Sequence, residues 1–131
     1  MKRVAFYGSL KEGYWNHSRF NLEKDKRHEN GVVTGSMYRS GMYDAWFPYL
    51  FEQAIDDSIN DREHVVEVYE IDDDKYDMIR RMEENSGYHE STVMVNGEEC
   101  NIFFADKYML DHLKKRGIDL WVDKYELPDF V

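Results

Sequence analysis

Glu83 is the residue whose position in the sequence gives it the clearest potential for acid–base chemistry. It lies near the end of a segment with helical periodicity, in which each residue adds about 100° around the axis. With Tyr76 set to zero, Glu83 falls at about 340° and its neighbour Glu84 at about 80°. The arc between about 200° and 360° holds the apolar side chains Met78, Ile79 and Met82. We therefore predict that Glu83 points toward the core and that Glu84 lies on the polar face.

A carboxylate that points inward can serve as a general base. Apolar surroundings disfavour the ionised form of Glu83 and raise its pKa, so that it can take a proton near neutral pH. A second interpretation stays open at this point, because helix ends fray. In it, Glu83 bends out to water or pairs with Arg80 or Arg81.

Other chemically reactive side chains lack suitable partners in the sequence. A nucleophile at Ser9 or Cys100 would need a histidine and an orienting acid, and the five histidines show no informative spacing. We expect Cys100 to be a core thiol. The run Asp72-Asp73-Asp74 lacks the alternating ligands and central glycine of a calcium loop, and no histidine pair has the spacing of a zinc site. No metal and no cofactor is predicted.

The first element that would shape a site is a strand close to the amino end. Apolar residues predict this strand from Arg3 to Tyr7, and Gly8-Ser9-Leu10 ends it abruptly. Gly13 and Asn16 then mark a loop. The strand therefore leads directly into a loop.

The remaining elements follow from capping and turn residues. Asp72-Asp73-Asp74 predicts a helix start, because Asp accepts hydrogen bonds from the first turn and complements the helix dipole, and this helix runs to about Asn85 or Gly87. The pair Asn96-Gly97 predicts a tight hairpin turn. Further strands are expected at Gly31 to Tyr38 (with a bulge or close backbone approach at Gly35), Tyr49 to Ala54, Val65 to Ile71, Thr92 to Val95 and Cys100 to Phe104. We also expect a loop from Asp56 to Asp61, a helix from Lys107 to Arg116 with Asp106 as its cap and Gly117 as its stop, and a packed tail from Ile118 to Val131.

Strands in hairpin-like succession with few helices predict the fold class. Five or six strands and two or three helices indicate an α+β fold, built on a small, strongly curved mixed sheet or barrel with two to three flanking helices. Residues 1–131 show no repeat or linker and are expected to form a single domain.

Composition narrows the classes of partner. The chain has 17 Lys and Arg against 27 Asp and Glu, a net charge of −10, which argues against binding nucleic acid. Its longest apolar run, Ala45 to Phe51, is too short to span a membrane, and the amino end lacks the apolar stretch of a secretory signal. A single cysteine, Cys100, cannot form an internal disulfide, so a cytoplasmic location is expected. Nothing in the sequence indicates the oligomeric state.

Three separated segments carry a resemblance to a known family. They are Val4 to Gly13, which contains Tyr7-Gly8-Ser9-Leu10 and is followed by Asn16; Gly35 to Tyr38 with Gly41-Met42-Tyr43 and Pro48-Tyr49-Leu50; and Ile79 to Glu83 followed by Tyr88. In this order and spacing the chain resembles the gamma-glutamylcyclotransferase-like proteins, which include the gamma-glutamylamine cyclotransferases and the plant avirulence-induced-gene-like proteins. The resemblance extends from about Val4 to Phe104.

The resemblance implies an enzyme that releases 5-oxoproline from a small gamma-glutamyl substrate. The α-amine of the gamma-glutamyl group attacks its own side-chain carbonyl and expels the attached amine, without a metal, a cofactor or a covalent intermediate. Glu83 takes the position of the catalytic glutamate and would act as general acid and base. The backbone N–H groups of Gly8, Ser9 and Leu10 would stabilise the developing oxyanion. Tyr7, Ser9 and Tyr88 would line the substrate cavity.

A non-catalytic function is the alternative. Members of the family usually carry Asp three residues before the glutamate and often Gly directly after it, whereas this chain has Arg80 and Glu84. In this interpretation the same cavity holds a small molecule, or the domain binds a protein, and no catalysis occurs. The sequence does not identify the amine that would leave.

Overall fold

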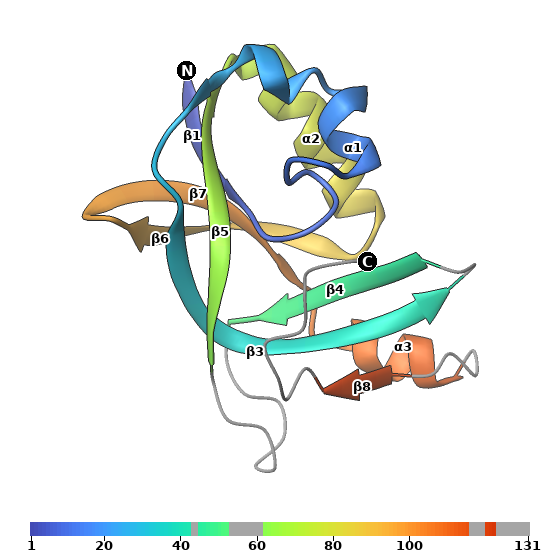
Figure 1. Ribbon diagram of the computed structural model, residues 1–131. Helices are drawn as coiled ribbons and strands as arrows, with labels where there is room; N and C mark the ends of the chain where they lie inside the picture. The colour runs from blue at the N-terminus through green and yellow to red at the C-terminus, as the bar shows by residue number, and fades with distance from the viewer. Residues whose placement is uncertain (43–44, 53–61, 116–119, 123–131) are drawn as a thin grey trace.

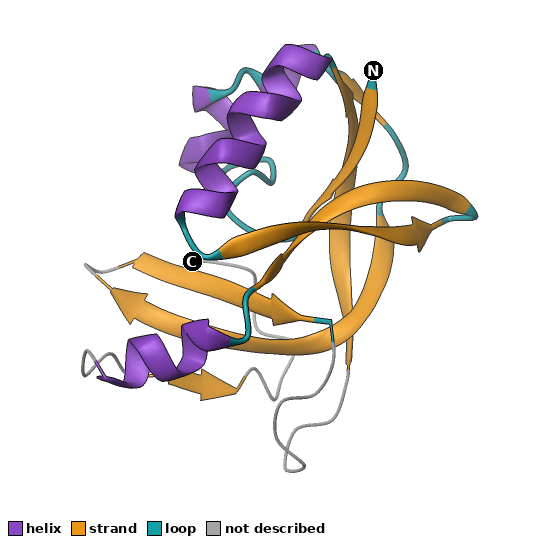
Figure 2. Ribbon diagram, turned by 180° about the vertical axis from the view of Figure 1, so that it is seen from behind, coloured by secondary structure: helices purple, strands orange, loops and turns teal. Residues whose placement is uncertain are grey.

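The protein folds around a strongly curved mixed sheet flanked by helices, as Figures 1 and 2 show from opposite sides. The computed structural model describes residues 1–42, 45–52, 62–115 and 120–122. The elements, in chain order, are β1 (Lys2–Phe6), α1 (Trp15–Arg19), the 3₁₀ turn η1 (Leu22–Lys24), β2 (Lys26–Arg27), β3 (Gly31–Met42), β4 (Ala45–Phe51), β5 (Arg62–Ile71), α2 (Asp73–Asn85), β6 (Tyr88–Val95), β7 (Glu98–Ala105), α3 (Tyr108–Lys115) and β8 (Leu120–Val122). The predicted α+β class with a curved sheet is confirmed.

The strands follow the order β4-β3-β5-β1-β7-β6, with β2 paired to β5 and β8 paired to β3. Among these pairs, β1 and β7 are parallel and the others are antiparallel. Helices α1 and α2 lie together beside β1 and β5, while α3 lies at the other end of the molecule, near β8 (Figures 1 and 2). The two ends of the sheet therefore carry different helices.

Strand β3 is curved and takes part in both ends of the sheet, because its first half pairs with one strand and its second half with another. Residues 31–35 pair with β5, and residues 36–42 pair with β4. At the junction lies Gly35, where an added Cβ would approach the Phe51 carbonyl oxygen to 2.8 Å and the Leu50 Cδ1 atom to 2.9 Å. The close backbone approach predicted at Gly35 is confirmed. The strand itself is 12 residues long and runs past the predicted end at Tyr38.

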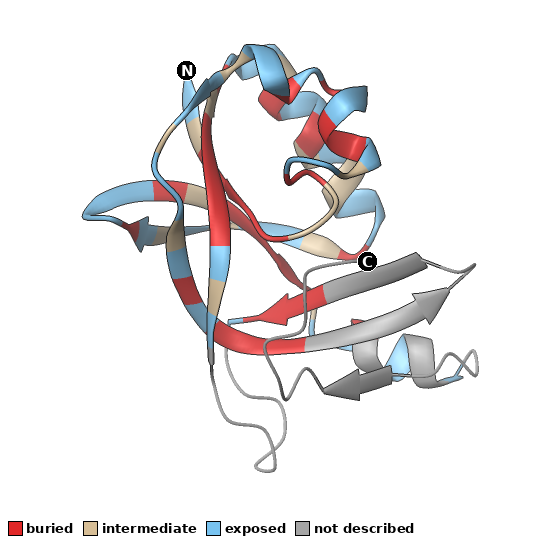
Figure 3. Cartoon of the chain, viewed as in Figure 1, coloured by how far each residue is buried: buried red, intermediate tan, exposed pale blue. Residues whose placement is uncertain are grey.

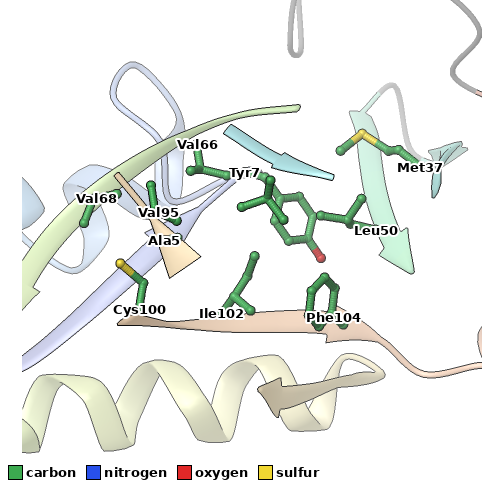
Figure 4. Close-up of a cluster of buried hydrophobic side chains, with 11 residues drawn as sticks. Ala5, Tyr7, Met37, Leu50, Val66, Val68, Val95, Cys100, Ile102 and Phe104 are labelled. Carbon is green, nitrogen blue, oxygen red and sulfur yellow. The ribbon is translucent and has the colours of Figure 1, made fainter. Parts of the chain in front are cut away.

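Buried apolar side chains form two clusters, and Figure 3 marks the buried residues along the chain. Because successive strand residues point to opposite faces, β1 contributes to both. Ala5 belongs to the inner cluster, which Figure 4 shows, whereas Val4 and Phe6 belong to the helix-facing cluster. The inner cluster comprises Ala5, Tyr7, Val33, Met37, Leu50, Val66, Val68, Val95, Cys100, Ile102 and Phe104. The helix-facing cluster comprises Val4, Phe6, Leu10, Phe20, Leu22, Tyr69, Ile71, Tyr76, Ile79 and Phe103.

Helix α2 begins and packs largely as the sequence predicts. Asp72 is its N-cap, and its Oδ1 atom accepts a hydrogen bond from the Lys75 backbone N–H at 2.7 Å. Tyr76 and Ile79 are buried in the helix-facing cluster. Met78 differs from the prediction, since it is 58% exposed. The apolar arc is narrower than predicted because the helix contacts the sheet along one side only.

The hairpin and the last helix also agree with the sequence. Strands β6 and β7 pair in antiparallel register, and the turn residues Asn96 and Gly97 have φ values of 51° and 79°. Helix α3 lies within the predicted range, and β8, in the predicted tail, pairs with β3.

Several other elements differ from the prediction. The segment taken as a loop around Asn16 contains the helix α1, and η1 and β2 follow before β3. These pieces are five, three and two residues long, too short to show periodicity in a sequence. Strand β4 starts at Ala45, four residues before the predicted start at Tyr49. Residues 53 and 54, the predicted loop from Asp56 to Asp61, the stop at Gly117 and the tail after residue 122 lie outside the described residues.

Candidate active site

A cavity of about 240 Å³ lies where the end of β1, helix α1 and the last turn of α2 meet. It is lined by Ala5, Phe6, Tyr7, Gly8, Ser9, Leu10, Trp15, Asn16, Arg19, Met82, Glu83, Ser86, Tyr88 and Phe103. All six residues that the sequence marked as site candidates are among them. Among these six candidates, Tyr7 and Tyr88 lie farthest apart in the sequence, 81 positions, and the fold brings them to the same cavity.

Glu83 forms part of the cavity wall, at the last turn of α2. Burial raises the pKa of its carboxyl from 4.5 to about 7. The second interpretation does not hold: Glu83 is not exposed, and no ion pair joins it to Arg80 or Arg81 among the described residues. Arg80 instead donates to Glu84 at 3.0 Å and to Asp77 at 3.4 Å. The inward orientation predicted from the helical periodicity is the one that the structure has.

Hydrogen bonds within the loop and to helix α1 hold the loop after β1 in place. The Lys11 backbone N–H donates to the Gly8 carbonyl at 3.0 Å, and His17 Nδ1 lies 3.0 Å from the Leu10 carbonyl oxygen. Asn16 Nδ2 donates to Ser9 Oγ at 2.7 Å. Helix α1, which carries both Asn16 and His17, therefore acts as a brace for the loop.

The backbone N–H groups of this loop are potential donors to a ligand. Within the described ranges, no residue accepts a hydrogen bond from the backbone N–H groups of Gly8, Ser9 or Leu10. All three residues line the cavity. Unpaired backbone donors beside a cavity fit an oxygen atom that carries or gains negative charge.

Tyr7 and Tyr88 form the inner wall together with Phe103. The Tyr7 hydroxyl donates to the Phe103 carbonyl at 2.6 Å, and the ring of Tyr88 stacks on that of Tyr49 with centroids 5.6 Å apart. Burial, together with the charge of Glu83, raises the pKa of Tyr7 well above its usual range. Burial likewise raises the pKa of Tyr88. Both hydroxyls therefore stay protonated at neutral pH and can act as donors.

The structure adds cavity residues that sequence reasoning did not assign to the site, among them Trp15, Arg19 and Ser86. Trp15 and Arg19 belong to α1, which is too short to be recognised from periodicity, so no local signal marked them. Asn16 was noted only as part of a motif, and its contact with Ser9 explains its place there.

The other reactive side chains remain separate from the cavity. Cys100 is buried in the inner cluster, and burial raises the pKa of its thiol. In the part of the chain that the structure describes, no three His, Cys, Asp or Glu side chains lie close enough to hold a metal ion. Within the same residues, no helix has the length and apolar character required to cross a membrane.

Solved structures share this fold at low sequence identity. A crystal structure of an AIG2-like protein from Mus musculus matches with a TM-score of 0.63 and 17% identity over 98% of this chain and 88% of that one. An uncharacterised protein from Pyrococcus horikoshii matches with a TM-score of 0.62 and 20% identity over 88% of this chain and 98% of its own. The urea amidolyase of Kluyveromyces lactis matches with a TM-score of 0.66 and 14% identity over 92% of this chain but only 7% of the larger protein. These likenesses establish the fold.

Sequence comparison establishes the family. A search of curated protein sequences finds no match. The model of the family described as "Gamma-glutamyl cyclotransferase, AIG2-like" matches residues 4–125, which is most of the chain. The protein therefore belongs to the AIG2-like gamma-glutamyl cyclotransferase family.

Proposed function

We propose that this protein is a cyclotransferase that releases 5-oxoproline from a gamma-glutamyl compound, with Glu83 as its general acid and base. One observation carries the proposal: the Glu83 carboxyl, whose pKa is raised to about 7, shares a small cavity with the loop after β1, whose backbone N–H groups have no acceptor among the described residues. Membership in the family supports a reaction of this type.

The reaction begins with removal of a proton from the α-ammonium of the gamma-glutamyl group, because an ammonium has no free electron pair. Glu83, ionised, accepts this proton. The amine nitrogen then forms a bond to the side-chain carbonyl carbon, closing a five-membered ring. The bond from that carbon to the departing nitrogen breaks. The attacking nitrogen loses two protons in all, and the departing amine gains two, with Glu83 as the carrier.

Negative charge develops on the carbonyl oxygen while the ring closes. In this proposal the backbone N–H groups of Gly8, Ser9 and Leu10 donate to that oxygen. Fixed backbone donors need no reorganisation as the charge appears, and the brace from α1 keeps this loop in position. Closure within one bound molecule also avoids the entropy cost of bringing two reactants together.

The size and walls of the cavity suit a small polar metabolite. Its volume of about 240 Å³ lies just below the range of about 300–1,000 Å³ typical of sites for drug-sized ligands. The rings of Tyr7, Tyr88 and Phe103 line the cavity beside Glu83, and a substrate bound against them would displace water there. Exclusion of water strengthens the electrostatic interactions on which the mechanism depends.

The charged residues in which the chain departs from its relatives lie on the outer face of α2. Glu84 is exposed and pairs with Arg80, which also pairs with Asp77. None of these three side chains lines the cavity. The departure that motivated a purely binding function therefore leaves the cavity wall intact.

The proposal is tested by incubating the protein with gamma-glutamyl amino acids, gamma-glutamylamines and glutathione and measuring 5-oxoproline. We expect release from at least one compound and a loss of about 10²-fold or more in Glu83→Gln. Glu84→Gln is the matched control, because it removes an adjacent carboxylate that lies outside the cavity, and it should keep activity. A folded Glu83→Gln protein with full activity would disprove the mechanism. Ligand-induced thermal stabilisation without any product would indicate the binding function instead.

A further inference from the structure

Two exposed side chains of α1 form the mouth of the cavity. Trp15 is 65% exposed, and Arg19 is exposed as well, yet both line the cavity. The buried residues Tyr7 and Phe103 line the same cavity from inside. A ligand that enters the cavity beside α1 therefore contacts Trp15 and Arg19.

The guanidinium of Arg19 is held by aromatic rings rather than by an acid. It lies 5.5 Å from the centroid of the Trp15 ring and 5.3 Å from that of Phe20. Its Nη1 atom lies 3.9 Å from Met82 Sδ, a weak acceptor. These contacts orient the side chain, and among the described residues its N–H groups meet no strong acceptor.

The ion pairs of the described residues bear on the charge of Arg19. The protein has 27 Asp and Glu against 17 Lys and Arg. Arg3, Arg27 and Arg80 each lie within 4 Å of a carboxylate. For Arg19, no carboxylate of a described residue lies within that distance, Glu83 included. As far as the described residues go, no carboxylate neutralises the Arg19 charge beside the cavity.

We propose that Arg19, with Trp15 beside it, binds a carboxylate carried by the departing amine, so that the preferred substrates are gamma-glutamyl amino acids. This inference rests on the proposed function. The gamma-glutamyl part must place its α-amine at Glu83 and its side-chain carbonyl at the loop, which leaves the departing group at the open end. There the planar guanidinium can bind a carboxylate through two parallel hydrogen bonds.

The same arrangement disfavours other departing groups. A neutral alkylamine forms no charged contact with Arg19, and a departing group that carries a second ammonium is repelled by it. Because the mouth is open to solvent, the discrimination should weaken as salt concentration rises. The Trp15 ring supplies apolar contact to the side chain of the amino acid without adding a charge requirement.

The test compares two substrates that differ only in the carboxylate: gamma-glutamylalanine and gamma-glutamylethylamine. We expect kcat/KM to be about fivefold or more higher for gamma-glutamylalanine, the range of a partly exposed pair of charges. Arg19→Gln should reduce this ratio to near one, mainly through a higher KM for gamma-glutamylalanine, and Arg19→Lys should restore part of it. Arg81→Gln is the matched control, because Arg81 lies on α2, is exposed and does not line the cavity, and the ratio should not change.

The outcomes separate this inference from the proposed function. If neither substrate nor any other gamma-glutamyl compound yields 5-oxoproline, the proposed function fails. If 5-oxoproline forms but the two substrates react equally well, or the ratio is the same in Arg19→Gln as in the parent protein, the assignment of Arg19 is wrong. Thermal melting of each variant verifies that the protein remains folded.

Discussion

Glu83 and Glu84 are adjacent at the end of α2, yet they occupy different surroundings. Glu83 lines the cavity, and burial raises its pKa to about 7, whereas Glu84 accepts a hydrogen bond from Arg80 Nη1 at 3.0 Å on the outer face. Neighbouring residues of a helix point about 100° apart around its axis, so Glu84 faces solvent while Glu83 faces the cavity. The pair offers a built-in comparison for experiments on either residue.

The pH dependence of activity should report the state of Glu83. A general base works in its ionised form, so kcat/KM should rise with pH through about 7 and fall about tenfold for each pH unit below it. The measurement is initial rates from pH 5 to 8 with substrate well below KM. A profile that stays flat between pH 5 and 8 would contradict the assignment of Glu83 as the base.

The stability of Glu83→Gln should change in the opposite direction to its activity. The folded-state pKa of Glu83, about 7, lies above its ordinary value of 4.5, so the folded protein binds more protons than the unfolded chain between these pH values. Stability from this group is therefore present at low pH and is lost as pH rises through about 7. At pH 8, Glu83→Gln should be more stable than the parent by about 2 kcal/mol, measured by urea unfolding. Glu84→Gln should show no such gain.

Tyr7→Phe should destabilise the fold. The variant removes the hydroxyl that donates to the Phe103 carbonyl at 2.6 Å and leaves a buried acceptor without that donor. We expect a loss of about 1–2 kcal/mol in the free energy of unfolding. Tyr108→Phe is the matched control, since Tyr108 is 58% exposed, and a change below about 0.5 kcal/mol is expected there. An equal effect of the two variants would show that the buried hydrogen bond contributes nothing.

Gly35→Ala should destabilise the fold, because the structure leaves no room for a Cβ atom at this position. Its Cβ would meet the Phe51 carbonyl oxygen at 2.8 Å and Leu50 Cδ1 at 2.9 Å, so strands β3 and β4 would have to separate. We expect a loss of about 2 kcal/mol, seen as a lower urea midpoint. Gly13→Ala serves as a comparison, because Gly13 has a φ of 90° but no atom within 4 Å of an added Cβ. Its cost should be the backbone strain alone, about 1 kcal/mol. Tolerance of Gly35→Ala without loss would argue against this close approach.

Local interactions explain which parts of the fold the sequence predicts well. The Asp72 cap, the Asn96-Gly97 turn and the alternation in β1 each depend on residues within a few positions of one another. The inward face of Glu83 depends on helical periodicity over two turns. For the cap, the turn and the strand the amino-acid sequence alone was sufficient, whereas for Glu83 it predicted the inward face and left the outward alternative open.

Features that depend on distant segments needed the structure. Helix α1 is five residues long, and its contacts with the loop after β1 and with Met82 of α2 place Arg19 at the cavity mouth. The bend of β3 at Gly35 depends on β4, and the full length of neither strand was predicted.

By itself, the sequence determined the type and order of most elements and the side of α2 on which Glu83 lies, because hydrogen bonds and side-chain periodicity act over short stretches of chain. Only the tertiary structure decided that Glu83 has a raised pKa, that the loop donors lie at its cavity, and that Arg19 has no acid partner among the described residues. Burial and charge pairing are properties of three-dimensional neighbours, and here those neighbours come from segments more than 60 residues apart, such as Arg19 and Met82.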